Sequence, residues 1–95
     1  MRILTVILGL AALLSFLAAC ESLPAAPDPA VDPVGYGQVM YERKCATCHE
    51  LYNPREFSRR AWTRAVKRYG PRAGLKREDR PYVEQYLHEN ASDAP

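Results

Sequence analysis

The chain has 95 residues, and its 13 Lys or Arg against 11 Asp or Glu leave a formal net charge of +2 at neutral pH. This length has room for one small domain and excludes a multidomain architecture. The three cysteines are an odd number, which disfavours a secreted protein held together by disulfides.

Residues 1–19 begin with one positive charge, Arg2, and continue as an apolar run, which is typical of a signal peptide. An uncleaved membrane anchor can have the same length. The run ends in Leu17-Ala18-Ala19-Cys20, which resembles the bacterial lipobox, where small residues precede a cysteine that is lipidated and becomes the mature N-terminus. We therefore predict a signal peptide with lipobox over 1–19 and lipidation of Cys20. An ordinary signal peptide or anchor, with Cys20 incidental, remains the alternative.

Residues 20–32 join this leader to the rest of the chain. After Cys20, the stretch ESLPAAPDPAVD is rich in Pro and Ala and has no hydrophobic period, which predicts an extended, semi-rigid tether. The residue after Cys20 is Glu21. By analogy with lipoprotein sorting in Gram-negative bacteria, where aspartate at that position favours retention, Glu21 indicates the periplasmic side of the outer membrane rather than the inner.

Residues 33–95 are predicted as the folded domain, and its first helix begins at Asp32-Pro33. Asp is a preferred N-cap, and Pro suits the first helical position. The segment Val34–Arg43 follows and leads directly into residues 45–49.

A second helix is indicated by apolar residues that recur at three- and four-residue intervals around the N-cap Ser58. These residues are Phe57, Ala61, Trp62, Ala65, Val66 and Tyr69. Gly70-Pro71 is expected to end this helix.

The last helix is expected to begin near Asp79, because Pro81 is tolerated only in a first turn, and to fray after Asn90. No segment alternates with a period of two over a useful length, so the predicted fold is all-α with about three helices. The apolar residues that could form its core are Val34, Tyr36, Val39, Met40, Tyr41, Leu51, Phe57, Trp62, Val66, Tyr69, Leu75, Val83, Tyr86 and Leu87. This inventory is thin for a core made of protein alone.

Residues 45–49 read Cys-Ala-Thr-Cys-His, the pattern for covalent attachment of a c-type haem. Two intervening residues hold Cys45 and Cys48 at the separation that reaction with two vinyl groups requires, and His49 then reaches the iron as its proximal ligand. A thioredoxin-like pair would need a βαβ pattern, and a zinc site would need a second compact ligand pair; neither follows. The sequence therefore predicts one covalent haem c, with the helices wrapped round it. If Cys20 carries lipid and Cys45 and Cys48 carry the haem, each of the three cysteines has one role.

With this motif, residues 33–88 resemble a small class I cytochrome c domain. The points of similarity outside the motif are Gly37 and Tyr41 before it and Tyr86-Leu87 in the last helix. The resemblance implies that the first and last helices cross closely at Gly37 and Tyr86, where glycine has no side chain to hold the backbones apart.

The run from His49 to Leu87 is similar, more narrowly, to a group of small periplasmic monohaem proteins. That group has a proline shortly after the motif and a tryptophan at the start of the middle helix, here Pro54 and Trp62. Class I domains also use a backbone carbonyl near the proline to accept the Nδ1 hydrogen of the proximal histidine. The resemblance therefore implies Asn53 or Pro54 as the acceptor that fixes the His49 ring. A proline that only turns the chain is the alternative.

The sixth ligand of the iron does not follow from the motif. The family's usual distal ligand is a methionine downstream of the motif, but Met40 precedes it and is expected in the core. In the narrower group methionine sits seven residues after the tryptophan, where this chain has Tyr69. Tyr69 could cover an open face without bonding, or bind as phenolate with help from nearby arginines. Distal ligation by His88, or by a lysine such as Lys67 or Lys76, also stays open.

Residues 55–80 hold ten Lys or Arg against three Asp or Glu, a local balance of +7. One interpretation is a solvated helix face, partly neutralised by the haem propionates. The other is a surface that docks an acidic redox partner or anionic lipid headgroups, because such patches steer encounter and orientation. Nucleic acid is not an expected partner of an exported lipoprotein.

The sequence thus predicts a periplasm-facing, lipid-anchored c-type cytochrome that carries single electrons between redox partners and is not an enzyme. Electron carriage is implied by the resemblance rather than by the motif itself. Two alternatives are a haem-based sensor or small-ligand-binding protein with an open distal face, and an accessory haem subunit of a larger oxidoreductase.

Overall fold

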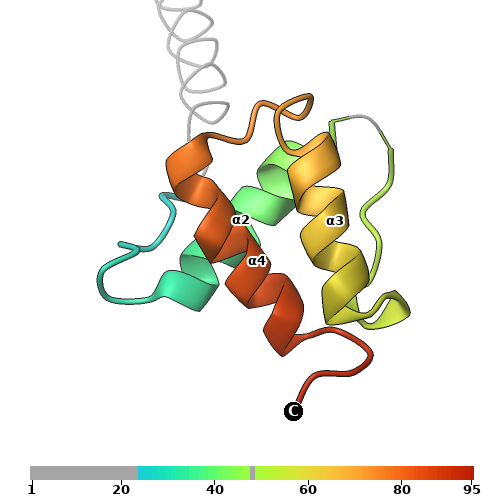
Figure 1. The fold of residues 1–95 in the computed structure, drawn as a ribbon. Coiled ribbons are helices and arrows are strands. Elements are labelled where there is room, and N and C mark those ends of the chain that lie inside the picture. Colours follow the sequence, from blue (N-terminus) through green and yellow to red (C-terminus); the bar gives the residue numbers. More distant parts are fainter. Residues whose placement is uncertain (1–23, 48) are drawn as a thin grey trace, which may run out of the picture.

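The structure is a computed structural model that describes residues 24–47 and 49–95. Across these ranges the chain forms α2 (Pro33–Cys45), η1 (Pro54–Glu56), α3 (Arg59–Tyr69), η2 (Arg77–Asp79) and α4 (Arg80–Glu89), and no strand. Figure 1 shows α4 crossing in front of α2 and running beside α3, so that α4 is the helix on which both others pack. The predicted all-α fold is confirmed.

Helix α2 begins where the sequence indicates. The Asp32 carboxylate accepts a hydrogen bond from the Gly35 amide at 2.9 Å, and Pro33 occupies the first turn. Arg43 and Lys44 lie in the last turn, where cations interact favourably with the negative end of the helix dipole. The helix ends at Cys45, so the first cysteine of the motif stands at the C-terminus of a rigid element.

Helix α3 also has its predicted cap, since the Ser58 hydroxyl accepts from the Ala61 amide at 3.2 Å. The helix ends at Tyr69, as Gly70-Pro71 predicts, but Gly70 itself stays right-handed with φ −51°. The left-handed residue is Gly74, at φ +76°. Gly74 is the last residue of the turn at 70–74. The next amide, that of Leu75, bonds to the Gly70 carbonyl at 2.9 Å and closes the turn.

Helix α4 begins at Arg80 with Pro81 in its first turn, as predicted. Asp79 does not cap it with its side chain. Its carboxylate is buried and accepts a hydrogen bond from the Tyr36 hydroxyl at 2.8 Å, which joins α2 to the start of α4. This bond is the main reason that the pKa of Tyr36 is raised. At the other end α4 ends at Glu89, and the side chain of its C-cap Asn90 bonds to the Tyr86 carbonyl at 2.8 Å. Instead of fraying after Asn90, the chain bonds back to the loop through the Ser92 amide and the Phe57 carbonyl at 3.0 Å.

The closest approach in the fold is the crossing of α2 and α4 at Gly37. A Cβ added to Gly37 would overlap the carbonyl oxygen of Tyr82 and lie 3.2 Å from the Cβ of Tyr86. The implied crossing of Gly37 with Tyr86 is confirmed, with its tightest point one turn earlier on α4. Only glycine lets the two backbones approach this closely.

The core lies between the three helices and is small. Its buried apolar residues are Met40, Tyr41, Trp62, Val66, Leu75, Val83, Leu87 and Ala91. The expectation that Met40 is a core residue is confirmed. Three residues expected in the core, Leu51, Phe57 and Tyr69, are instead exposed. Phe57 and Tyr69 are exposed because they border a cavity rather than other protein atoms.

The described part of the predicted tether, residues 24–32, lies against the domain instead of extending from it. The Arg43 guanidinium donates to the Pro24 carbonyl at 2.5 Å, and Ala26 packs against the core. Asp28 then forms a turn in which its carboxylate accepts from the Ala30 amide at 2.8 Å. The predicted leader at 1–19 and the lipidation site Cys20 lie outside the described residues. No helix within the described ranges has the length and apolar composition to cross a bilayer.

We predict that Gly37→Ala destabilises the protein by about 1–3 kcal/mol or more, because the methyl group forces α2 away from the Tyr82 carbonyl. Urea unfolding followed by far-ultraviolet circular dichroism measures the change. The control is Gln38→Ala, the next residue on α2, which is exposed and should shift the midpoint little. A Gly37→Ala protein as stable as its parent would contradict the close crossing.

Candidate functional site

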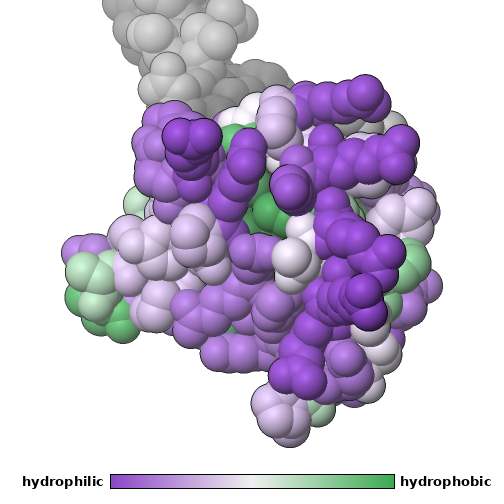
Figure 2. Space-filling model, in the orientation of Figure 1, coloured by the Kyte–Doolittle hydropathy of each residue, from purple (hydrophilic) through white to green (hydrophobic). Residues whose placement is uncertain are grey.

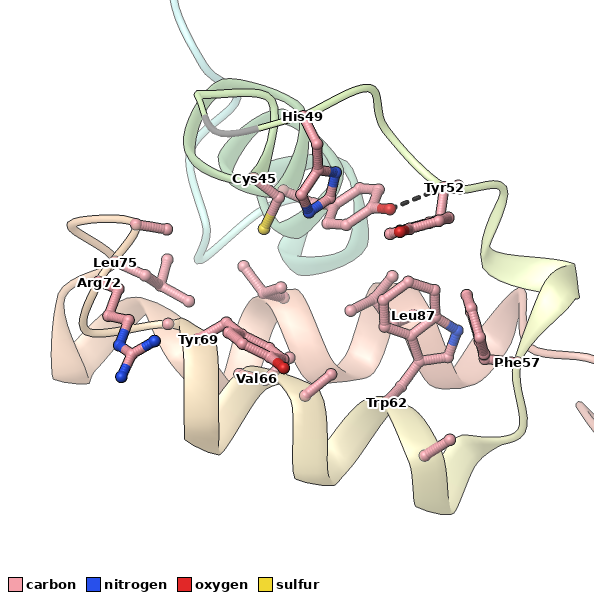
Figure 3. Close-up of a pocket in the computed structure, with 16 residues that line it drawn as sticks. Cys45, His49, Tyr52, Phe57, Trp62, Val66, Tyr69, Arg72, Leu75 and Leu87 are labelled. Carbon is pink, nitrogen blue, oxygen red and sulfur yellow. Dashed lines mark hydrogen bonds between the residues drawn. The ribbon is translucent and has the colours of Figure 1, made fainter.

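The main cavity has a volume of about 650 Å³ and lies between the end of α2, the inner face of α3 and α4. Figure 3 shows Cys45 and His49 on one side of it and Val66 and Tyr69 of α3 on the other, with Leu87 of α4 behind. Its size falls within the range typical of cofactor pockets. Apart from Cys45, His49, Arg72 and the hydroxyls of three tyrosines, the walls are aliphatic and aromatic.

The end of α2 directs the motif toward this cavity. The Thr47 hydroxyl donates to the Lys44 carbonyl at 2.8 Å, which satisfies a carbonyl at the C-terminus of the helix and turns the chain. In Figure 3 the Cys45 sulfur and the His49 imidazole both point into the cavity. Cys48, the second predicted attachment site, lies outside the described residues.

The His49 ring is held by the backbone of its own neighbour. Nδ1 lies 2.6 Å from the Glu50 carbonyl oxygen. Because a carbonyl can only accept, Nδ1 carries the hydrogen, and the Nε2 lone pair is left for a metal. The implied acceptor, Asn53 or Pro54, is therefore wrong.

The physical reason is that both of those carbonyls have other donors. The Pro54 carbonyl accepts from the Trp62 indole at 2.8 Å, and the Asn53 carbonyl accepts from the Glu56 amide at 3.0 Å. The proline loop thus anchors Trp62, the tryptophan at the start of α3, rather than the histidine.

A chain of aromatic rings supports His49 from the loop side. The Tyr52 ring lies 4.9 Å from His49, and Phe57 lies 5.4 Å from Tyr52, measured between centroids. Phe57 in turn contacts Trp62 edge-to-face at 5.3 Å. Tyr52 is a site residue that the sequence analysis missed, and its place three residues after His49 is the signal that could have indicated it.

The loop that carries Tyr52 is tied back to α2 by Tyr41. The Tyr41 hydroxyl donates to the Tyr52 carbonyl at 2.6 Å. Burial is the main cause that raises the pKa of Tyr41 to about 12, and burial also raises the pKa of its neighbour Tyr86. Tyr41 therefore stays protonated at neutral pH, and its hydrogen bond holds the wall of the cavity in place.

Of the predicted distal candidates, the structure brings only Tyr69 to the cavity. The His88 Nε2 lies 2.8 Å from the Thr63 hydroxyl, and neither residue lines the cavity. Lys67 and Lys76 are exposed and do not line the cavity either. Arg72, which no part of the sequence analysis singled out, does line it.

A haem fits the residues present. The cavity combines a thiol and an imidazole from one short segment with a largely apolar remainder, and an apolar planar cofactor with an iron centre needs this combination. Cys45 and Cys48 would hold the porphyrin, and His49 would bind the iron through Nε2. Val66, Val83 and Leu87 would supply the apolar packing surface.

Basic residues cover the outer side of α3. Nine of the ten Lys and Arg between 55 and 80 are exposed, Arg80 being half-buried. Within the described residues, only Arg59 forms an ion pair, with Asp93 at 3.7 Å. In Figure 2 hydrophilic side chains accordingly dominate the face over α3.

Comparison with known proteins gave one family. The family model described as dihaem cytochrome c matches residues 41–95, which include the Cys-Ala-Thr-Cys-His motif and all of α3 and α4. Searches among curated proteins and among solved structures gave no match.

We predict that Tyr41→Phe lowers the stability of the protein at neutral pH by about 1 kcal/mol, because the bond to the Tyr52 carbonyl is lost. The substitution should also reduce the loss of stability at alkaline pH. A tyrosine whose pKa is about 12 when folded and about 10 when unfolded stabilises fully below pH 10, and this contribution disappears as pH rises toward 12.

Urea midpoints measured between pH 7 and pH 11.5 test both effects. The control, Tyr82→Phe, removes a hydroxyl from α4 outside the cavity and should retain the alkaline loss of stability that Tyr41 causes. An equally steep alkaline loss in Tyr41→Phe would show that another group is responsible.

Proposed function

We propose that this chain, which belongs to the dihaem cytochrome c family, carries single electrons through one covalently bound haem c. Membership of the family supports haem-based electron transfer. The observation that carries the proposal is the placement of Cys45 and His49 on one wall of a cavity with apolar surfaces opposite.

The proposed roles follow from the chemistry of each side chain. Cys45 and Cys48 form thioethers to the porphyrin, and His49 is the proximal ligand, oriented by the Glu50 carbonyl. Bound haem supplies a one-electron iron couple. The apolar walls exclude water and hold the group rigidly, and an electron carrier needs both.

The proposal of a single haem goes beyond family membership, because the family is described as dihaem. The 95 residues contain three cysteines and one Cys-x-x-Cys-His, at 45–49. That motif lies inside the matched range, and the remaining cysteine, Cys20, belongs to the proposed lipobox. We further propose that the protein acts as a carrier rather than as an enzyme.

The proposed location is the periplasmic side of a bacterial membrane, more specifically the outer membrane, with Cys20 lipidated. The support is the order of residues 1–21 alone. The contact of Pro24 with Arg43 bears on the anchor, because it leaves only residues 21–23 between a lipidated Cys20 and Pro24 at the domain surface. The four residue steps from Cys20 to Pro24 span at most about 14 Å. The domain would therefore lie close to the bilayer.

The proposed partner is a redox protein with an acidic surface that docks over α3. The exposed cations of α3, chiefly Arg60, Arg64, Lys67 and Arg68, lie on the helix whose inner face lines the cavity. A partner drawn to these charges would therefore reach the haem site across a single helix. Charge of this kind mainly accelerates and orients encounter.

We predict that the protein expressed with haem-attachment machinery carries one haem per chain, measured by pyridine haemochrome absorbance against protein mass. It should titrate as a single reversible one-electron couple. Cys45→Ser combined with Cys48→Ser should abolish covalent haem. Cys20→Ser, the matched control, should keep the haem and lose the lipid. Two haems per chain would contradict the single-haem proposal, and none would contradict the function.

We predict that Arg64→Glu with Arg68→Glu slows oxidation of the reduced protein by ferricyanide several-fold at low ionic strength, because the local field attracts the anion less. The difference should shrink as salt screens it. Gln85→Glu, an exposed change on α4, should have a smaller effect. Equal rates for the double variant and its parent would show that α3 does not steer the encounter.

A further inference from the structure

We infer that the wall opposite His49 is a binding site for a small neutral diatomic ligand, such as carbon monoxide or nitric oxide, with the Tyr69 hydroxyl as hydrogen-bond donor. This inference rests on the proposed haem site and names a ligand class for its second face. It depends on one juxtaposition: Tyr69 of α3 faces the cavity from the side opposite Cys45 and His49.

The chain's strong iron ligands are placed elsewhere. Among the described residues, Met40 is buried in the core and does not line the cavity. His88 meets Thr63 at 2.8 Å, and Lys67 and Lys76 point to solvent outside the lining. The wall that α3 presents therefore has no thioether, imidazole or amine to close the second axial position.

The apolar side chains that α3 and α4 add to that wall suit a small neutral ligand. Ala65 and Val66 from α3 and Leu87 from α4 form an apolar surface, which favours an uncharged molecule over a hydrated ion. Trp62 offers no polar contact there, because its indole hydrogen bonds to the Pro54 carbonyl.

Tyr69 supplies the one hydroxyl on this wall, and its ring has a neighbour that steadies it. The guanidinium carbon of Arg68 lies 5.5 Å from the centroid of the Tyr69 ring, within cation–π range. Figure 3 shows the phenol lying along the cavity beside Val66, on the side away from His49. A neutral hydroxyl in this place can donate to a bound diatomic molecule and still leave the second face open.

The first test adds carbon monoxide to the reduced holoprotein, after pyridine haemochrome has established that the haem is attached. We expect a saturable Soret shift with one carbon monoxide per haem. A low-spin spectrum that carbon monoxide leaves unchanged would overturn the inference while the haem site and electron carriage stand. Loss of haem itself would be a failure of the proposed function, and the haemochrome assay separates the two.

The second test uses Tyr69→Phe, which keeps the ring and removes the donor. The C–O stretching band of the carbon monoxide complex should shift to higher frequency, since loss of a donated hydrogen bond weakens back-donation into the ligand. An unchanged band would overturn the role of the hydroxyl. Disappearance of a ferric charge-transfer band in Tyr69→Phe would overturn the open face, because it would identify Tyr69 as a phenolate ligand.

The third test installs a ligand. Tyr69→Met should give a low-spin protein that no longer binds carbon monoxide, because a thioether at this position faces the second axial site. The matched control is Lys67→Met, on the same helix but outside the cavity lining, which should bind carbon monoxide like the parent. Continued carbon monoxide binding by Tyr69→Met would place position 69 away from the iron and overturn the inference.

Discussion

The close approach of α2 and α4 at Gly37 is the constraint on which the rest of the molecule depends. The two helices lie nearly in backbone contact there, and a Cβ on residue 37 would overlap the Tyr82 carbonyl. This contact fixes where α2 ends, and therefore where Cys45 stands relative to α4 and to α3, which packs beside α4. A shift of the crossing would move the first attachment point of the haem away from its opposite wall.

The second requirement is a rigid loop after the motif, and polar contacts fix this loop beside the ring contacts of Tyr52 and Phe57. Asn53 and Glu56 form a reciprocal cap around η1, the Pro54 carbonyl holds Trp62, and Tyr41 holds the Tyr52 carbonyl. His49 needs only the Glu50 carbonyl to set its ring. The loop is thus anchored to both α2 and α3, and a hydrogen bond to the carbonyl of the next residue orients the imidazole.

Electron carriage and an open second face are compatible in this arrangement. The proximal side depends on covalent attachment and on the fixed His49, whereas the opposite side is formed by short apolar side chains and Tyr69. The outward face of α3 is strongly basic and the inward face lines the cavity, so one helix serves both the proposed partner and the proposed ligand. Carbon monoxide binding and anion-steered oxidation would then report on opposite faces of the same helix.

Local sequence alone determined the features that depend on a few neighbouring residues. The cap at Asp32, the cap at Ser58, the first-turn place of Pro81 and the haem motif at 45–49 all follow from chemistry within one or two helical turns. The glycine crossing was also predictable, through a resemblance, because no other residue permits it.

Tertiary structure decided everything that required choosing between competing partners. Asp79 could have capped α4 but bonds to Tyr36, and Pro54 could have held His49 but bonds to Trp62. His88 could have reached an iron but meets Thr63, and the proline-rich stretch lies against the domain because Pro24 and Ala26 find places there. In each case the sequence names a donor or acceptor, and only the packed chain shows which partner lies within hydrogen-bonding distance.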